Sequence, residues 1–226
     1  MKTYLYSIAL LTIAGTLGAP QTSTVTPVPV EEEPLHKVVF KNDFVTVLHV
    51  TLPPGQTTLY HSHVHDRVAI NLSAATVTQQ KLNEPEGPPA ATEPGSISAL
   101  TLTGSAYTHR VHNVGAATYE VLDIEPARRP ATPSPDVAAT VAAENPSARV
   151  YSWALAPGAT SPMHTHMRPY IIVSVIPMNL KMSSPDGQTA SHEVAAGDFH
   201  YIDAKITHNL SNVGSAPGQI IEVELK

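Results

Sequence analysis

A histidine pattern occurs twice in this chain and constrains the fold more than any other feature of the sequence. Each copy has two histidines separated by one residue and, 46 or 42 residues later, a third histidine with an asparagine four residues beyond it. Side chains two residues apart on a β-strand point to the same face. The sequence therefore predicts two related β-units, each able to bring three imidazoles together. The copies are His61, His63, His109 and Asn113, and His164, His166, His208 and Asn212.

The turns around these histidines repeat as well. Residues 52–55 read Leu-Pro-Pro-Gly and residues 155–158 read Leu-Ala-Pro-Gly, and each segment ends six residues before its His-x-His pair. Residues 113–115 and 212–214 both read Asn-Val-Gly. The His-x-His pairs are 103 residues apart and the third histidines are 99 residues apart. The same order and the similar spacing indicate one duplicated β-unit.

The alternation of short β-branched runs and turns along the chain indicates an all-β protein. Short β-branched runs separated by Pro- and Gly-containing turns fill residues 36–126 and 148–226, which is typical of an antiparallel sandwich or barrel. Residues 20–35 are rich in Thr, Pro and Glu, and we expect a flexible spacer there. Residues 127–147 form a Pro-rich linker. Within it, residues 136–144 could form a short helix, because prolines flank them.

The first 19 residues have the features of a secretory signal. Lys2 gives a basic start, residues 4–15 are apolar, and small residues follow. The apolar stretch is shorter than the ~20 residues that a membrane-spanning helix needs. We therefore expect a signal peptide over residues 1–19, a secreted or periplasmic protein and no membrane span. The alternatives are a buried N-terminal strand and an uncleaved anchor.

Composition excludes several kinds of site. The chain has no cysteine, so it contains no disulfide, no zinc–thiolate site, no iron–sulfur cluster and no cysteine nucleophile. A formal net charge of −6 without a basic patch argues against nucleic acid as a partner. Histidine, with 12 copies in 226 residues, is the abundant metal-binding residue.

Three converging imidazoles would hold a divalent transition metal ion. Three protein ligands leave coordination positions for water, dioxygen or substrate, which is the layout of a catalytic metal site. The sequence leaves open whether the metal is Fe, Mn, Zn, Ni or Cu. The alternative is that these histidines are hydrogen-bonded residues of a barrel interior. The predicted ligands are His61, His63 and His109 in the first copy, and His164, His166 and His208 in the second.

The same motifs resemble those of the cupin superfamily, and their duplication resembles a two-barrel cupin, or bicupin. The family's first motif begins Gly-x₅-His-x-His, which is matched from Gly55 and from Gly158. Its second motif ends His-x₃-Asn, which both copies keep. Gly197 matches the start of that motif in the second copy, whereas residues 203–205 replace its central Pro-x-Gly. The resemblance covers roughly residues 36 to 226 and implies two tandem double-stranded β-helix (jelly-roll) barrels, with pairing of barrel sheets in a homodimer.

The carboxylate of the family's first motif is absent from both copies. Arg67 stands at its position in the first copy and Tyr170 in the second. Arg67 would repel a divalent ion, so we expect an anion contact, a charge exposed at the barrel mouth, or a side chain that turns away and leaves its place to His65. Tyr170 could hydrogen-bond a metal-bound water or pack in the barrel. The second copy is therefore the stronger metal candidate.

Two functions follow from these features, and the sequence leaves open whether the protein is an enzyme. The first is an exported three-histidine Fe(II)-type dioxygenase acting on a small molecule, because such centres are similar to those of cupin dioxygenases. The second is a non-catalytic bicupin that binds a metal or a small ligand, which the lost carboxylates favour. A metal-dependent isomerase or decarboxylase is a weaker third, because cupins with that chemistry usually keep the glutamate.

Overall fold

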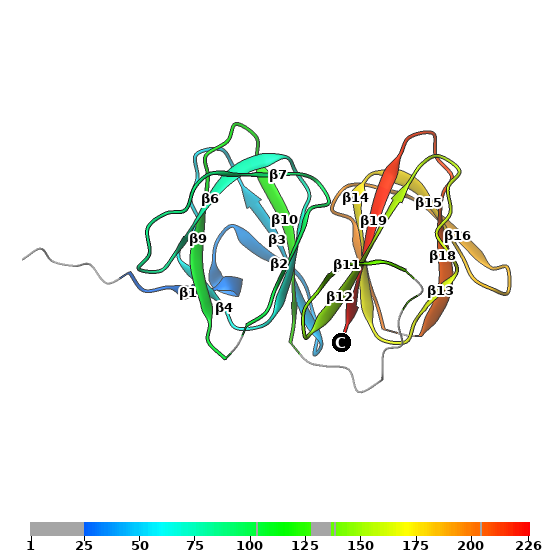
Figure 1. Cartoon of the computed structure of the whole chain (residues 1–226), viewed down its shortest axis with the longest axis horizontal. Helices are drawn as coiled ribbons and strands as arrows, with labels where there is room; N and C mark the ends of the chain where they lie inside the picture. The colour runs from blue at the N-terminus through cyan, green and yellow to red at the C-terminus, as the bar shows by residue number, and fades with distance from the viewer. Residues whose placement is uncertain (1–24, 103, 128–136, 138, 204) are drawn as a thin grey trace, which may run out of the picture.

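Two β-barrels lie side by side in the computed structural model of the chain (Figure 1). The structure describes residues 25–102, 104–127, 137, 139–203 and 205–226, so the predicted signal peptide lies outside the described residues. The described part contains 19 strands and one short 3₁₀ helix, η1. None of its helices has the length and apolar character needed to cross a membrane.

The first barrel is built from two five-stranded sheets, ordered β1-β4-β9-β6-β7 and β2-β3-β10-β5-β8. Its elements are β1 (Val28–Pro29), η1 (Val30–Glu32), β2 (His36–Lys41), β3 (Val45–Leu52), β4 (His61–His63), β5 (Arg67–Asn71), β6 (Ala75–Lys81), β7 (Ala90–Thr92), β8 (Ile97–Leu100), β9 (Tyr107–Asn113) and β10 (Tyr119–Pro126).

The second barrel has a five-stranded sheet, ordered β11-β12-β19-β14-β17, and a four-stranded sheet, ordered β13-β18-β15-β16. Its strands are β11 (Val141–Glu144), β12 (Ala148–Leu155), β13 (His164–His166), β14 (Tyr170–Ile176), β15 (Met178–Ser183), β16 (Thr189–Val194), β17 (Phe199–Ile202), β18 (Ile206–Asn212) and β19 (Gly218–Leu225). The all-β fold with two tandem jelly-roll barrels is confirmed.

Each histidine set is assembled by one antiparallel strand pair. In the first barrel β4 pairs with β9, and His61 lies opposite His109. In the second barrel β13 pairs with β18, and His164 lies opposite His208. A strand pair therefore places the third histidine beside the first two, and it does so identically in both copies.

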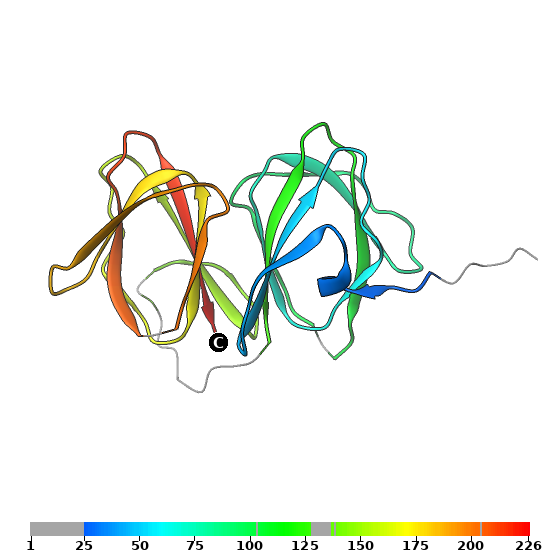
Figure 2. The ribbon, with the colours of Figure 1, turned by 180° about the vertical axis from the view of Figure 1, so that it is seen from behind.

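The two barrels share one hydrophobic core. The five-stranded sheets that contain β10 and β19 lie next to each other in the middle of the molecule (Figures 1 and 2), and alternate side chains of their strands meet between them. Phe40 of the first barrel stacks on Tyr201 of the second at 5.2 Å. These sheet faces are used within one chain, so they are not free for the homodimer contact suggested by the family resemblance. The buried residues at this interface include Val45, Val47, Val68, Ile70, Leu122, Ile124, Ile171, Val173, Ile221 and Val223.

Two expectations about the connecting segments are wrong. Residues 28–35, expected to be part of a flexible spacer, are built into the first barrel: β1 pairs with β4, and buried Glu33 accepts hydrogen bonds from the amide of Leu59 and from His36 Nδ1. Residues 141–144, expected to be helical, form β11 at the edge of a sheet. In both cases pairing with a neighbouring strand overrides the local sequence preference.

The motif asparagines fix the turns that follow the third histidines. The side-chain amide of Asn212 donates to the carbonyls of Leu155 and Ala216, and its Oδ1 accepts from the amide of Gly214. Asn113 makes the equivalent three bonds in the first barrel. Both side chains are completely buried. These asparagines therefore hold the strand ends and do not contact the imidazoles.

Replacing Asn212 by Ala is expected to lower the free energy of unfolding by about 1 to 3 kcal/mol, because it removes the side-chain donor to the buried carbonyl of Leu155 and to the carbonyl of Ala216. Urea denaturation measures the change. Asn209→Ala is the matched control on the same strand, since Asn209 Oδ1 has no hydrogen-bond partner among the described residues. Equal stability of the two variants would contradict this role for Asn212.

Candidate metal centres

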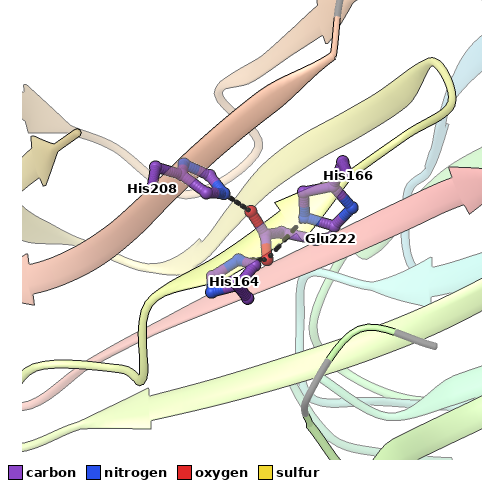
Figure 3. A group of neighbouring side chains, drawn as sticks. All are labelled: His164, His166, His208 and Glu222. Carbon is purple, nitrogen blue, oxygen red and sulfur yellow. Dashed lines mark hydrogen bonds and ion pairs between the residues drawn. The ribbon is translucent and has the colours of Figure 1, made fainter. Parts of the chain in front are cut away.

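Three histidines and a glutamate meet inside the second barrel (Figure 3). His164 and His166 come from β13, His208 from β18 and Glu222 from β19. The shortest nitrogen–oxygen distances to the carboxylate are 3.0 Å from His164, 3.4 Å from His166 and 3.2 Å from His208. All four side chains are buried. The centre therefore contains three imidazoles and one carboxylate.

Strand alternation brings Glu222 into this centre. On β19, Ile221 and Val223 face the interface between the barrels, so Glu222 and Glu224 face the barrel interior. The last strand of each barrel, β10 or β19, therefore has apolar residues on its outward face and buried acids on its inward face. A buried carboxylate needs strong partners, and the histidines provide them.

Further contacts orient the imidazoles. Nδ1 of His164 lies 2.8 Å from the carbonyl of Pro162, and Nδ1 of His166 lies 3.0 Å from Glu224 Oε2. Partners of this kind on the far nitrogen fix the ring of a metal-binding histidine and leave its other nitrogen directed at the ion. Here they direct Nε2 of both rings toward Glu222, the group that marks the middle of the centre.

Two aromatic side chains enclose the centre. The Trp153 ring stacks on His164 at 5.0 Å, and its indole nitrogen donates a 2.7 Å hydrogen bond to Glu222. The Tyr170 ring stacks on His166 at 4.0 Å. Tyr170 is fully buried, and its hydroxyl has no hydrogen-bond partner among the described residues. It packs against the ligands rather than replacing the family's carboxylate.

The centre balances charge between its acid and its imidazoles. Burial alone would raise the pKa of Glu222, but hydrogen bonds from three imidazoles outweigh it and hold the pKa well below its usual range. Burial would likewise lower the pKa of His166, yet Glu222 and Glu224 outweigh it and raise the pKa to about 9. Burial lowers the pKa of His208. The surrounding imidazoles therefore favour the ionised form of the Glu222 carboxylate.

Several buried polar atoms in this centre make no hydrogen bond of good geometry among the described residues, although three of them lie at ion-pair distance from a partner. They are His166 Nε2, both ring nitrogens of His208 and Glu222 Oε1. Such atoms are costly in a folded protein unless another group satisfies them. Neutral imidazole nitrogens and a carboxylate oxygen are ligands of divalent transition metals. The donor set and its unsatisfied atoms therefore fit a metal ion.

The first barrel brings the other three predicted ligands together without a carboxylate between them. Nε2 of His63 and Nε2 of His109 lie 3.1 Å apart, and the rings of His61 and His109 lie 4.6 Å apart. Burial, reinforced by neighbouring positive charge, lowers the pKa of His61 and of His63 to about 3 and lowers that of His109 further. These imidazoles are neutral. His65 lies beyond the end of β4, outside this cluster.

Arg67 is held inside the first barrel by Asp123. Its Nε donates to Oδ1 at 2.9 Å, its Nη2 lies 2.8 Å from Oδ2, and its side chain is 15% exposed. The expectation of an exposed charge at the barrel mouth is wrong, because Arg67 is paired with Asp123 inside the barrel. A contact with an external anion stays a prediction. Nη1 also lies 3.5 Å from Nε2 of His63. A fixed positive charge thus stands against one of the candidate ligands.

The two barrels differ at two equivalent positions beside the histidines. Strand registers make Asp123 equivalent to Glu222, and Arg67 equivalent to Tyr170. In the second barrel the acid is the longer Glu222, and it contacts the histidines because no arginine is present to pair with it. Glu125 and Glu224 are also equivalent, and each contacts Nδ1 of the second histidine of its pair.

The acids on the last strand of each barrel were not among the predicted site residues. The family resemblance places a carboxylate in the first motif, whereas the acids here come from β10 and β19. The repeat itself contains the signal: residues 123–125 read Asp-Ile-Glu and residues 222–224 read Glu-Val-Glu, 99 residues apart. That spacing equals the spacing of the third histidines.

Comparisons with known proteins agree with this architecture. Residues 151–224, in the second barrel, match the family described as Cupin domain. The second barrel therefore matches a cupin domain, and both barrels have the cupin fold. AerE from Microcystis aeruginosa matches 86% of this chain and 98% of its own, with a TM-score of 0.55 and 14% identity. Likeness at this identity shows the fold alone, and it extends the cupin fold to both barrels.

Two further relatives of this cupin are informative. The oxalate decarboxylase of Bacillus subtilis, in a structure concerned with its Mn(II) centres, has a TM-score of 0.53 at 14% identity and covers 81% of this chain and 69% of its own. The Beta-alanine degradation protein BauB of Pseudomonas aeruginosa is 28% identical over 92 residues, which are 41% of this chain and 96% of that protein.

Replacing Arg67 by Met is expected to lower the free energy of unfolding by about 3 to 5 kcal/mol, because Asp123 is left as an unpaired buried charge. The double variant Arg67→Met with Asp123→Leu should regain most of the loss, since it removes both charges. Denaturant unfolding of the two variants and the native protein measures this. A single variant as stable as the native protein would show that the guanidinium is not needed by Asp123.

Proposed function

We propose that the second barrel binds one divalent transition metal ion through His164, His166, His208 and Glu222. The observation that carries the proposal is the convergence of three imidazoles on a buried carboxylate, with donor atoms left unsatisfied. The ion would replace the contacts that now join Glu222 to the rings. The Mn(II) centres of the similarly folded oxalate decarboxylase support Mn or Fe as the first metals to test.

The residues around the ion have separate duties in this proposal. Glu224 and the carbonyl of Pro162 orient two of the rings, and Trp153 holds the carboxylate. Tyr170 covers His166 and excludes water from that side. When bound, the ion supplies a Lewis acid and open coordination positions at which a small molecule and dioxygen can meet.

The first barrel is the weaker site in this proposal. Arg67 lies against His63, and Asp123, the acid equivalent to Glu222, already forms an ion pair with Arg67. A divalent ion would have to enter beside a fixed guanidinium, which costs electrostatic free energy in a buried place. We therefore expect one metal ion per chain, in the second barrel.

We further propose that the protein acts outside the cytoplasm as a metal-dependent oxidoreductase of the dioxygenase type on a small molecule. The signal-like segment at residues 1–19 supports export, and the buried metal-binding set with aromatic cover supports redox chemistry. The alternative is a non-catalytic cupin that binds a metal. Oxygen consumption by the metal-loaded protein, with small thiols and carbonyl compounds as substrates, separates the two.

Metal binding can be followed through Trp153, the one tryptophan of the chain. Its ring stacks on a proposed ligand and bonds to another, so a paramagnetic ion in the second barrel should quench most of its fluorescence. Titration of the metal-free protein with Mn²⁺, Fe²⁺ under anaerobic conditions, or Co²⁺ is expected to saturate at one ion per chain. His166→Ala should weaken binding by at least about tenfold.

His63→Ala is the matched control, since His63 occupies the equivalent position in the first barrel. It should leave the quenching titration within about twofold of the native protein. Absence of quenching in the native protein by every metal would contradict the proposal. Equal losses in His63→Ala and His166→Ala would contradict the assignment of the ion to the second barrel.

A further inference from the structure

Two neighbouring cavities open beside the proposed metal centre in the second barrel. The larger has a volume of about 410 Å³ and lies between β15 and β16 on one side and β14 and β17 on the other. The smaller, of about 230 Å³, reaches His208. Met182 and Ala190 line both cavities. The two cavities are therefore neighbours, and the smaller one brings this part of the barrel to a proposed metal ligand.

The walls of the larger cavity are largely apolar. No Lys, Arg, Asp or Glu is among the described residues that line either cavity. The volume lies in the range of small-molecule sites, which are mostly apolar with a few placed polar groups. The larger cavity is lined by Ile172, Leu180, Met182, Ala190, His192, Val194, His200, Tyr201 and Ile202.

Two histidines supply its polar groups. His192 on β16 lies opposite Leu180 in the strand register, and His200 on β17 lies opposite Ile172. Both imidazoles line the cavity and are exposed to solvent there. They face the barrel interior on two edge strands, β16 and β17. Each can donate or accept a hydrogen bond within the cavity.

The first barrel has no such pair. Its strand registers place Ala90 at the position of His192 and Ser98 at the position of His200. The histidines are therefore a feature of the barrel that has the four-residue metal-binding set. Nothing in the shared architecture of the barrels requires imidazoles at these two places, because the first barrel forms the same strands without them.

We propose that this cavity binds a small, uncharged, largely apolar molecule through hydrogen bonds to His192 and His200, and that this molecule is the substrate or ligand presented to the metal centre. Only the last part of this proposal, that the bound molecule is presented to the metal centre, rests on the proposed function. A small dianion such as oxalate would lose its hydration in a cavity whose described lining offers no cationic Lys or Arg, which is unfavourable. A neutral molecule with one carbonyl or hydroxyl group avoids that loss.

Acetophenone and benzoate test the proposal, because they are similar in size but only benzoate is charged. Saturation-transfer NMR titrations with the metal-free protein at neutral pH should detect acetophenone binding at least about tenfold tighter than benzoate, with no binding of oxalate. Ala190→Phe, which fills both cavities from the exposed edge strand, should weaken acetophenone binding by at least tenfold. Ser191→Phe, one residue along and facing outward, should change it by less than twofold.

The first barrel supplies a second pair of variants. His192→Ala and His200→Ser replace each histidine by the residue at the equivalent position of the first barrel. Each variant should weaken acetophenone binding by about three- to tenfold, as expected for one lost hydrogen bond. Failure of acetophenone to bind, tighter binding of benzoate or oxalate, or an unaffected Ala190→Phe would overturn the proposal. Quenching of Trp153 by metal in the same variants reports separately on the proposed function, so the two failures are distinguishable.

Discussion

Strand β19 connects the two main features of the molecule through the alternation of its side chains. Its outward residues, including Ile221 and Val223, pack into the core shared by the barrels, and its inward residues Glu222 and Glu224 support the histidines. The acids are tolerated because each contacts imidazole, so burial does not leave a charge unpaired. A shift of one residue in the register of this strand would exchange the two faces and destroy both the interface and the candidate metal centre.

The divergence of the barrels shows how two substitutions can change a site without changing a fold. Both copies keep three histidines, the asparagine that holds the turn, and the acid that orients the second histidine of each pair. They differ at the positions of Arg67 and Tyr170, and in the length of the acid at 123 and 222. In one barrel the acid is neutralised by arginine, and in the other it is left to the imidazoles. This difference, rather than the histidine count, separates the two centres.

Sequence alone predicted the fold and the histidine sets well, because period-two alternation and the repeat spacing are local or directly countable. It did not predict that Glu222 completes the centre. The acids of residues 123–125 and 222–224 repeat in the sequence, but their approach to the histidines depends on how the two sheets of a barrel face each other. Sequence alone also misjudged Arg67, because the partner Asp123 is 56 residues away in the chain. The same limit explains residues 28–35 and 141–144. Their local composition favours spacer or helix, but pairing with β4 and β12 decides their structure.

The proposed metal site of the second barrel requires that Glu222 and the three histidines bind the same ion. Crystals grown with Mn²⁺ and measured at wavelengths on both sides of the manganese absorption edge test this directly. We predict one anomalous peak per chain in the second barrel, about 2.0 to 2.3 Å from three imidazole nitrogens and from a Glu222 oxygen. No peak in that barrel, a peak only among His61, His63 and His109, or a Glu222 side chain turned away from the ion would contradict the account.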